Sequence, residues 1–127
     1  MINEQNGKRE YDLEERTFKF AMDVRNFIRK LPKTITNRED VGQLTRCSGS
    51  VAANYIEANE ALSRKDFSYR IKVCRKEAKE SRLFLRLVFV GDKTELLEER
   101  ENLCDEAMQL VKIFNKIIGT TKSVTIS

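Results

Sequence analysis

Paired glutamates at helical spacing come nearest to a catalytic arrangement in this sequence. Glu57 and Glu60 are three residues apart, and so are Glu77 and Glu80. Glutamates on facing helices can hold a di-iron centre, but two of those helices also supply a Glu-x-x-His motif. The sequence contains no histidine, so such a centre cannot be completed and no mechanism can use an imidazole. We therefore expect these glutamates to be surface charges or partners of arginines.

The three cysteines also lack the features of a reactive or metal-binding set. Cys47, Cys74 and Cys104 are far apart in the chain and show no metal-ligand spacing. A cysteine nucleophile needs an activating base or a lowered pKa, and no histidine is present to act as that base. We expect three reduced thiols of the kind that packs in a core. The protein is accordingly predicted to have no enzymatic activity, no metal and no cofactor.

Basic residues form the one extended pattern that could bind a ligand. They are spaced three, four, three and four residues apart, so they share one face of a helix: Lys72, Arg75, Lys79, Arg82 and Arg86. We call these five residues the basic stripe. Such a stripe can neutralise the phosphates of a nucleic acid, although a solvated or salt-bridged helix face is a commoner explanation. The whole chain carries only +4, and no aromatic residues alternate with the basic ones as a base-stacking platform requires.

Four blocks of apolar residues at steps of three and four predict the helices that carry these side chains. We expect helices at approximately 11–31, 37–60, 64–90 and 94–118 of the 127 residues. Pro32 ends the first block, Thr36 followed by Glu39 resembles a capping box, and Ser63 is a candidate N-cap. Gly91 separates the last two blocks, and Gly119 is a candidate C-cap.

The predicted architecture is one all-α domain, an antiparallel up-down left-handed four-helix bundle with loose termini. Connections of a few residues place successive helices side by side in opposite directions, and an apolar period near 3.5 is typical of left-handed packing. The N-terminus has no apolar signal region. The most apolar run, residues 83–90, is far shorter than the about 20 residues of a membrane span. We expect a cytoplasmic protein with no membrane contact.

The end of the third block is too apolar for a helix that buries only one face. Leu83, Phe84, Leu87 and Val90 lie beside or opposite the core-facing positions of that block. A helix that is apolar all round is normally buried all round. We therefore predict a subunit interface at these four residues, with a loop or the N-terminal arm folding over them as the alternative.

Charge is divided between two adjoining segments. Residues 64–91 contain nine basic and three acidic side chains, a net charge of +6. Residues 92–106 contain seven acidic and two basic side chains, a net charge of −5. The acids suit the first turns of a helix, and they are candidates to pair with Arg82 and Arg86 or with a neighbouring subunit.

Three stretches resemble one known family. They are the helix ending Phe27-Ile28-Arg29-Lys30-Leu31-Pro32, the run Gln43-Leu44-Thr45-Arg46 followed by residues 50–58 (SVAANYIEA), and Phe67 with residues 76–81 (KEAKES) and Leu85. In this order they resemble the 23S rRNA intervening-sequence proteins, also called S23 ribosomal proteins. The resemblance implies a left-handed bundle that assembles as a ring-like homopentamer and has no established enzymatic activity. The accessory protein of diversity-generating retroelements, which binds a reverse transcriptase and nucleic acid, is a more distant likeness.

Within the family-like motifs, five polar residues are predicted to form a structural network: Arg46, Asn54, Glu57, Glu77 and Glu80. A buried charge is costly unless it is paired, so we hypothesise that a buried Arg46 bonds Glu77, Glu80 or Glu57. A role at a subunit interface or in ligand contact remains open for these residues.

The sequence together with the resemblance favours a self-assembling, non-enzymatic bundle that serves as an RNA-binding or rRNA-associated scaffold. The expected partners are further copies of the chain, in a pentamer, and RNA. The alternative is a protein–protein adaptor, an accessory subunit that docks on a larger nucleic-acid enzyme without a direct role in RNA binding.

Overall fold

Four helices make up the computed structural model, which describes the backbone of residues 2–126 and the side chains of residues 13–120. They are α1 (Ile2–Ile28), α2 (Ile35–Asn59), α3 (Arg64–Leu87) and α4 (Thr94–Ile126). No strand occurs in the described backbone. The prediction of an all-α protein with four helices is therefore confirmed.

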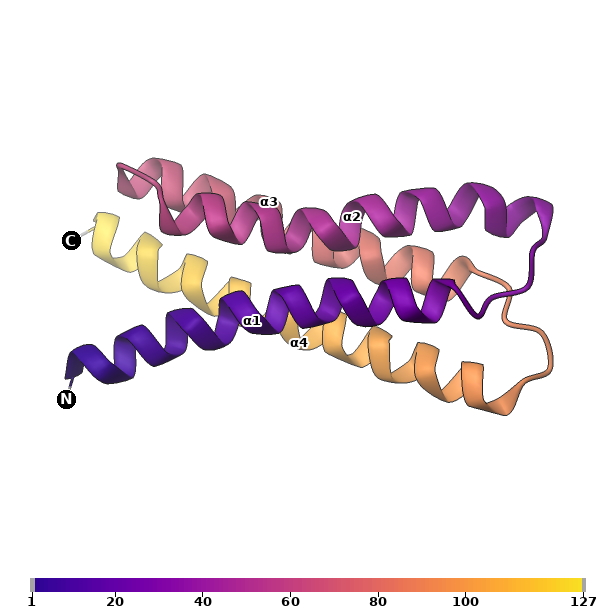
Figure 1. Cartoon of the computed structure of the whole chain (residues 1–127). Coiled ribbons are helices and arrows are strands. Elements are labelled where there is room, and N and C mark those ends of the chain that lie inside the picture. The colour runs from indigo at the N-terminus through magenta and orange to yellow at the C-terminus, as the bar shows by residue number, and fades with distance from the viewer. Residues whose placement is uncertain (1, 127) are drawn as a thin grey trace.

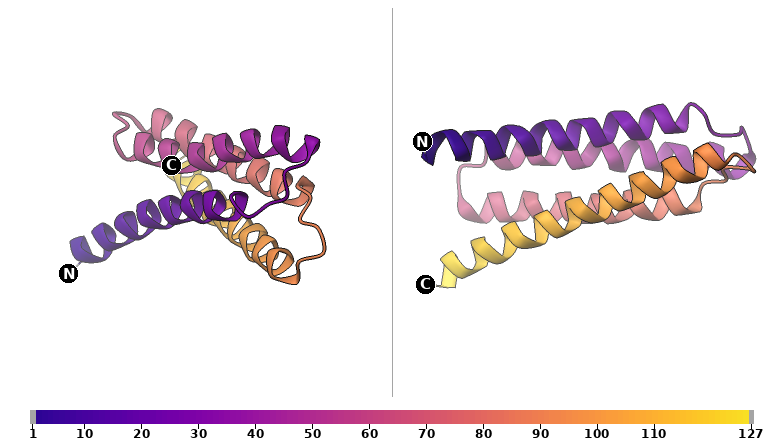
Figure 2. Two further views of the ribbon diagram at one scale, coloured as in Figure 1. Left: turned by 45° about the vertical axis from the view of Figure 1, so that its right-hand side comes forward. Right: turned by 90° about the horizontal axis from the view of Figure 1, so that it is seen from below.

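The helices run back and forth along one long axis (Figure 1). Each helix contacts the helices next to it in the chain, and α1 also contacts α4. The contact between α1 and α4 is the least extensive of the four, and that between α2 and α3 is the most extensive. α4 crosses the others at an angle, so that the start of α1 and the end of α4 diverge (Figure 2).

The core runs through the middle of the bundle and receives side chains from all four helices. Its largest members with almost no exposed surface are Phe20, Val24 and Phe27 of α1, Leu44 and Val51 of α2, Ile71 and Leu85 of α3, and Leu110 and Phe114 of α4. Within each helix these residues recur at steps of three and four, the spacing from which the four helical blocks were predicted, because such residues share one side of a helix.

The outer helix ends were predicted too short. α1 begins at Ile2 rather than near residue 11, because the polar segment before it contains no proline to stop a helix. The predicted loose tail after residue 118 is helical to Ile126, and Gly119 is no C-cap because it lacks the left-handed backbone that such a cap requires. Thr120 donates a hydrogen bond to the Lys116 carbonyl one turn earlier.

The inner ends show how the chain turns. α2 is capped by Thr34, not Thr36, and the Thr34 hydroxyl accepts from the Asn37 amide at 3.1 Å. Ser63 caps α3 as predicted, accepting from the Asp66 amide. α3 stops at Leu87, three residues early, because Val88 is extended and Gly91 takes a φ of 73°, a conformation that glycine adopts readily.

No helix among the described residues is long and apolar enough to span a bilayer.

Candidate nucleic-acid and subunit-interaction surfaces

The basic stripe lies along the side of α3 that faces α4. Lys72, Lys79 and Arg86 are exposed, whereas Arg75 and Arg82 are half-buried. Arg75 donates to the Asn115 side chain of α4 at 2.9 Å. No member of the stripe makes an ion pair with the side chains of residues 13–120. The structure therefore leaves the five positive charges of α3 without acidic partners among the side chains of residues 13–120.

Two acidic residues of α4 pair with α1 instead. Glu106 accepts two hydrogen bonds from Arg16, at 2.7 and 2.9 Å, and Glu99 accepts from Lys30 at 2.8 Å. Arg82 and Arg86, which we considered as partners of these acids, make no such pair within residues 13–120. Glu99 and Glu106 thus link α4 to α1 and do not neutralise the basic stripe.

The four residues of the predicted apolar interface differ in exposure, because α3 ends at Leu87, before the last of them. Leu83 and Leu87 are 47% and 54% exposed, and Phe84 packs partly against the core. Val90 is only 4% exposed, so its assignment to the interface is wrong. Since the helix has ended before it, the extended chain at Val88 turns Val90 inward.

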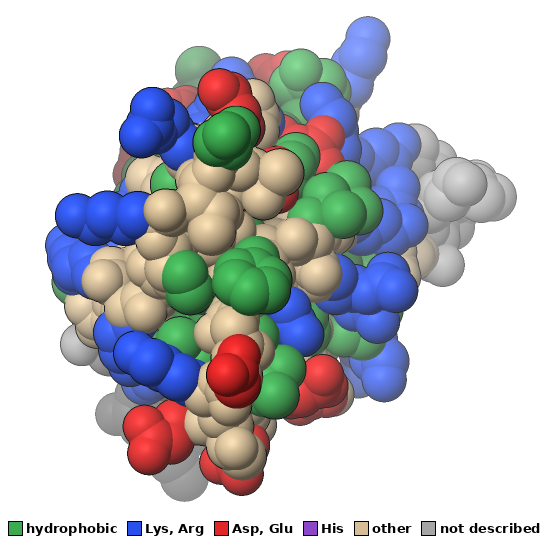
Figure 3. All heavy atoms as spheres, turned by 90° about the vertical axis from the view of Figure 1, so that its right-hand side faces the viewer, with side chains coloured by type: hydrophobic (Ala, Val, Ile, Leu, Met, Phe, Trp, Pro, Cys, Tyr) green, Lys and Arg blue, Asp and Glu red, His purple; other side chains and the backbone are tan. Residues whose placement is uncertain are grey.

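The neighbouring residue, Phe89, is exposed although Val90 is not. Phe89 is 53% exposed at the connection between α3 and α4. The end of the bundle formed by the α1–α2 and α3–α4 connections shows exposed hydrophobic side chains, with basic side chains at both sides and several acidic ones at the lower edge (Figure 3). Leu83, Leu87 and Phe89 are each about half exposed, so the side chains of residues 13–120 leave much of this surface uncovered.

The Arg46 network exists in a different form from the predicted one. Arg46 lies 3.6 Å from Glu77 and 3.5 Å from Glu80, and it also donates to Gln43 at 3.1 Å. The buried member is Glu77, whose side chain is 7% exposed, whereas that of Arg46 is 56% exposed. The expectation of a buried arginine is therefore wrong: α3 turns Glu77 into the bundle, and Arg46 covers it from the surface of α2.

Burial has a direct electrostatic effect on Glu77. Desolvation raises the pKa of this carboxyl above its ordinary value, the neighbouring Glu80 raises it further, and Arg46 and Lys76 lower it. Its Oε2 atom is buried and accepts no hydrogen bond from the described residues. Arg46 thus offsets a charge that the bundle solvates poorly.

Asn54 and Glu57 do not belong to this network. The Asn54 amide donates to the Ser50 carbonyl and hydroxyl, both at 2.9 Å, and its oxygen accepts from Arg70 at 3.0 Å. Glu57 is exposed and makes no ion pair with the side chains of residues 13–120. Asn54 therefore links α2 to α3 at a separate point, and the inclusion of Glu57 was wrong because its side of α2 faces solvent.

Two polar residues that link neighbouring segments of the chain escaped the sequence analysis. Asn37 is 2% exposed; its amide donates to the carbonyls of Pro32 and Phe89 and its oxygen accepts from the Phe89 amide, each at 2.8 Å. Arg25 donates to the carbonyls of Ala21 and Thr45, at 3.0 and 3.2 Å. Gly49 is the one sequence signal for Arg25, because a Cβ there would lie 2.9 Å from the guanidinium.

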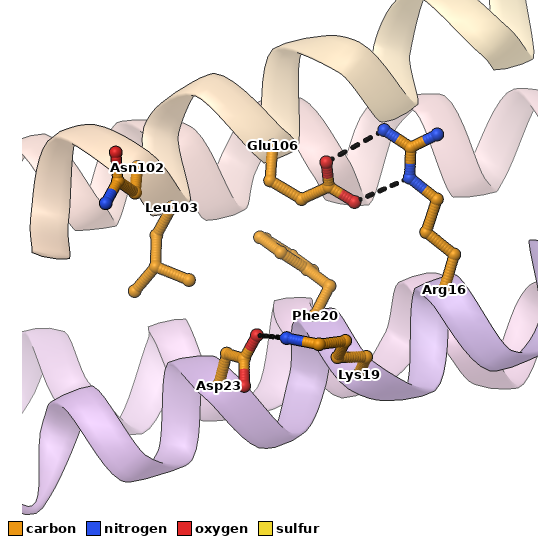
Figure 4. Close-up of a pocket in the computed structure, with 7 residues that line it drawn as sticks. All are labelled: Arg16, Lys19, Phe20, Asp23, Asn102, Leu103 and Glu106. Carbon is orange, nitrogen blue, oxygen red and sulfur yellow. Dashed lines mark hydrogen bonds and ion pairs between the residues drawn. The ribbon is translucent and has the colours of Figure 1, made fainter.

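A shallow pocket of about 370 Å³ opens between α1 and α4. Phe20 and Leu103 lie between the two helices, and polar residues surround them (Figure 4). On one side Arg16 bonds Glu106, and on the α1 side Lys19 bonds Asp23 at 2.7 Å. Asn102 completes the lining from α4. The pocket thus combines an apolar floor with a polar rim whose charges are paired within the chain.

The thiols lack the electrostatic features of nucleophiles. Burial raises the pKa of Cys74 to about 12 and also raises the pKa values of Cys47 and Cys104. Cys47 and Cys74 are buried, and all three are free. Among the residues the structure describes, no group of three or more cysteines and carboxylates is arranged to hold a metal ion.

Similarity to known proteins identifies the family of this chain. The chain is similar to a crystal structure from Bacteroides thetaiotaomicron VPI-5482, described as a protein with unknown function from the S23 ribosomal protein family. The TM-score is 0.71 at 25% identity, covering 84% of this chain and 97% of that one. No protein of curated function matches the chain. Residues 9–116 match the family of the 23S rRNA-intervening sequence protein, and the chain belongs to this family.

Proposed function

We propose that this protein is a non-enzymatic scaffold that assembles with copies of itself and binds RNA through the basic stripe of α3. The observation that carries the proposal is the absence of acidic partners for these five side chains within residues 13–120. A stripe that served only as a salt-bridged helix face would be paired with the acids of α4. Unpaired cations suit a nucleic acid backbone, because each can neutralise one phosphate and release the counterion condensed there.

The self-assembly half of the proposal is supported by a different surface. Leu83, Leu87 and Phe89 are each about half exposed near one end of the bundle. An apolar cluster of this kind marks an interaction site more often than bare solvent contact. We include the left-handed up-down arrangement and the homopentamer in the proposal. The order of helix contacts supports the up-down arrangement, and the family membership supports the left-handed packing and the assembly. A cytoplasmic location suits an RNA partner.

The absence of catalysis rests on chemistry. No imidazole is available anywhere in the sequence, and burial raises the pKa values of all three thiols. The α1–α4 pocket presents charged groups that already bond one another. None of these features supplies an activated nucleophile or a general base.

Filter binding to a structured RNA across a salt series tests the RNA partner. Replacing Lys72, Arg75 and Arg82 with alanine should weaken binding at least tenfold and flatten the slope of log K against log salt by about two, since each phosphate contact contributes roughly 0.7–0.9. Arg29, Lys33 and Arg38 are exposed basic residues outside α3, and their triple alanine variant is the matched control. Equal losses for both triple variants, or binding that does not depend on salt, would contradict the proposal.

A protein–protein adaptor is the second candidate, and the exposed Leu83, Leu87 and Phe89 favour it. If the wild-type protein binds no RNA at any salt concentration, this apolar surface remains as the functional feature, and a protein partner replaces RNA.

A further inference from the structure

The surfaces of α3 and α4 carry opposite charges along rows of the same length. On α3, Lys79 and Arg86 lie one turn to either side of Leu83, and all three are exposed. On α4, Glu98 and Asp105 lie one turn to either side of Asn102, and these three are exposed as well. The two outer charges of each row are seven positions apart in the sequence, which corresponds to about 10 Å along a helix.

The acidic row is free to meet a partner. Glu98 and Asp105 make no ion pair within residues 13–120, in contrast to Glu99 and Glu106 beside them, which bond α1. Lys79 and Arg86 are likewise without acidic partners among these side chains. Four exposed charges, two of each sign, therefore stand unpaired on different helices of one chain.

The centre of the α3 row is an apolar side chain, and the centre of the α4 row lies at the edge of a pocket. Leu83 projects from α3 with 47% of its surface exposed. Asn102 lies at the edge of the pocket whose floor is Phe20 and Leu103 (Figure 4). The limited contact between α1 and α4 leaves this hollow open. A protruding leucine between two cations thus has a counterpart in a pocket whose edge at Asn102 lies between two anions of α4.

From this match we infer that α3 of one copy packs against the α1–α4 groove of a second copy. Leu83 lies over the pocket, and Lys79 and Arg86 face Glu98 and Asp105. The two charges of each row are alike, so the match holds whichever way the two helices run. The contact joins two different surfaces, and such heterologous contacts generate rings when the rotation closes.

The inference rests on the self-assembly proposed above and specifies its surfaces. It also divides the basic stripe into two sets. Lys79 and Arg86 meet the neighbouring copy, whereas Lys72, Arg75 and Arg82 are left for phosphate. The RNA-binding test changes only the second set, so no side chain is altered in both tests.

Charge reversal on each surface tests the inference. We expect the wild type to exceed 14.8 kDa in light scattering at low micromolar concentration. Lys79→Glu with Arg86→Glu should reduce the mass to that of a single chain, and Glu98→Lys with Asp105→Lys should do the same. The variant carrying all four changes should recover the wild-type mass, because the reversed charges again attract each other across the contact.

The four-change variant also separates loss of the interface from loss of folding, since a misfolded chain would not reassemble. Leu83→Ser should dissociate the protein, whereas Leu62→Ser, at a 99% exposed position in the α2–α3 connection, is the control that should not. A wild type of single-chain mass overturns the inference together with the proposed self-assembly. An assembled wild type whose pairwise reversals leave the mass unchanged, or whose four-change variant stays a single chain, overturns this interface alone.

Discussion

The contact between α2 and α3 differs in kind from the contact between α1 and α4. Where α2 meets α3, Cys47, Val51, Ile71 and Cys74 have no exposed surface. Polar groups there are also used internally, since the Ser81 hydroxyl bonds the Cys47 sulfur at 3.3 Å. These two helices form the most extensive contact in the bundle. Little of this surface is left for any partner.

Where α1 meets α4, a few apolar side chains and two ion pairs hold the helices together. Phe20 and Leu103 meet in the middle, and the Arg16–Glu106 and Lys30–Glu99 pairs lie at the surface. Exposed ion pairs contribute little to stability. The comparison indicates that the α2–α3 side stabilises the bundle, whereas the α1–α4 side leaves a groove where another molecule can bind.

The largest expected difference between the two sides is in the response to cavity formation. Leu44 on α2 is 0% exposed and Leu103 on α4 is 6% exposed. Leu44→Ala should lower the free energy of unfolding by about 3–5 kcal/mol, because the surrounding core cannot collapse. Leu103→Ala should cost about 2–3 kcal/mol, since it borders an existing pocket that water can enter. Urea unfolding at one fixed protein concentration measures both. Equal losses would remove the distinction between the two sides.

The next largest effect concerns the charge that the α2–α3 side buries. Arg46→Ala should lower the free energy of unfolding by about 1–3 kcal/mol, because it leaves the Glu77 carboxylate without its cation. Arg38→Ala is the control, since Arg38 is an exposed arginine of the same helix and makes no ion pair with the described side chains. Thermal unfolding followed by circular dichroism compares the two. A melting temperature that Arg46→Ala leaves unchanged would show that Glu77 does not need this partner.

Glu77 also predicts a dependence on pH. Because burial and Glu80 raise its pKa in the folded protein, the folded state holds this proton more tightly than the unfolded chain does. As the pH rises from the unfolded pKa through the raised folded value, the wild type therefore loses stability. Glu77→Gln removes this loss, so the stability of the variant relative to the wild type should increase over that interval. Urea unfolding of both proteins across the interval measures the difference, and a constant difference would contradict the raised pKa.

The sequence predicted the helices and their buried sides because both follow from local spacing. Ser63 as a cap and the core positions of α3 depend only on nearby residues, and each is found in the structure. The helix ends were less predictable. α3 ends early at Leu87. The segment after it is held by Asn37, which bonds the backbone of Phe89, fifty-two residues later in the sequence. A bond between two connections is not visible in the period of either helix.

The candidate surfaces were predicted in part for the same reason. Position on a helix face identified Leu83, Leu87 and the basic stripe, whose residues lie on one side of α3. Spacing along one helix could not show that Glu77 rather than Arg46 is buried, because that depends on how α3 is rotated against α2. Nor could it show that the acids of α4 pair with α1, since both neighbours of α4 offer basic residues.

The smallest expected effect is on the ion pair that links α1 to α4. Arg16 and Glu106 form two hydrogen bonds, but their side chains are 40% and 29% exposed. A double-mutant cycle with Arg16→Ala and Glu106→Ala should give a coupling energy of about 0.2–1 kcal/mol that decreases as salt is added, since water and ions screen exposed charges. Urea unfolding of the four proteins at low and high salt measures this coupling. A value of several kcal/mol that resists salt would mean that the α1–α4 contact is as firmly held as the α2–α3 contact, and the groove between α1 and α4 would then lose its distinction as the open side of the bundle.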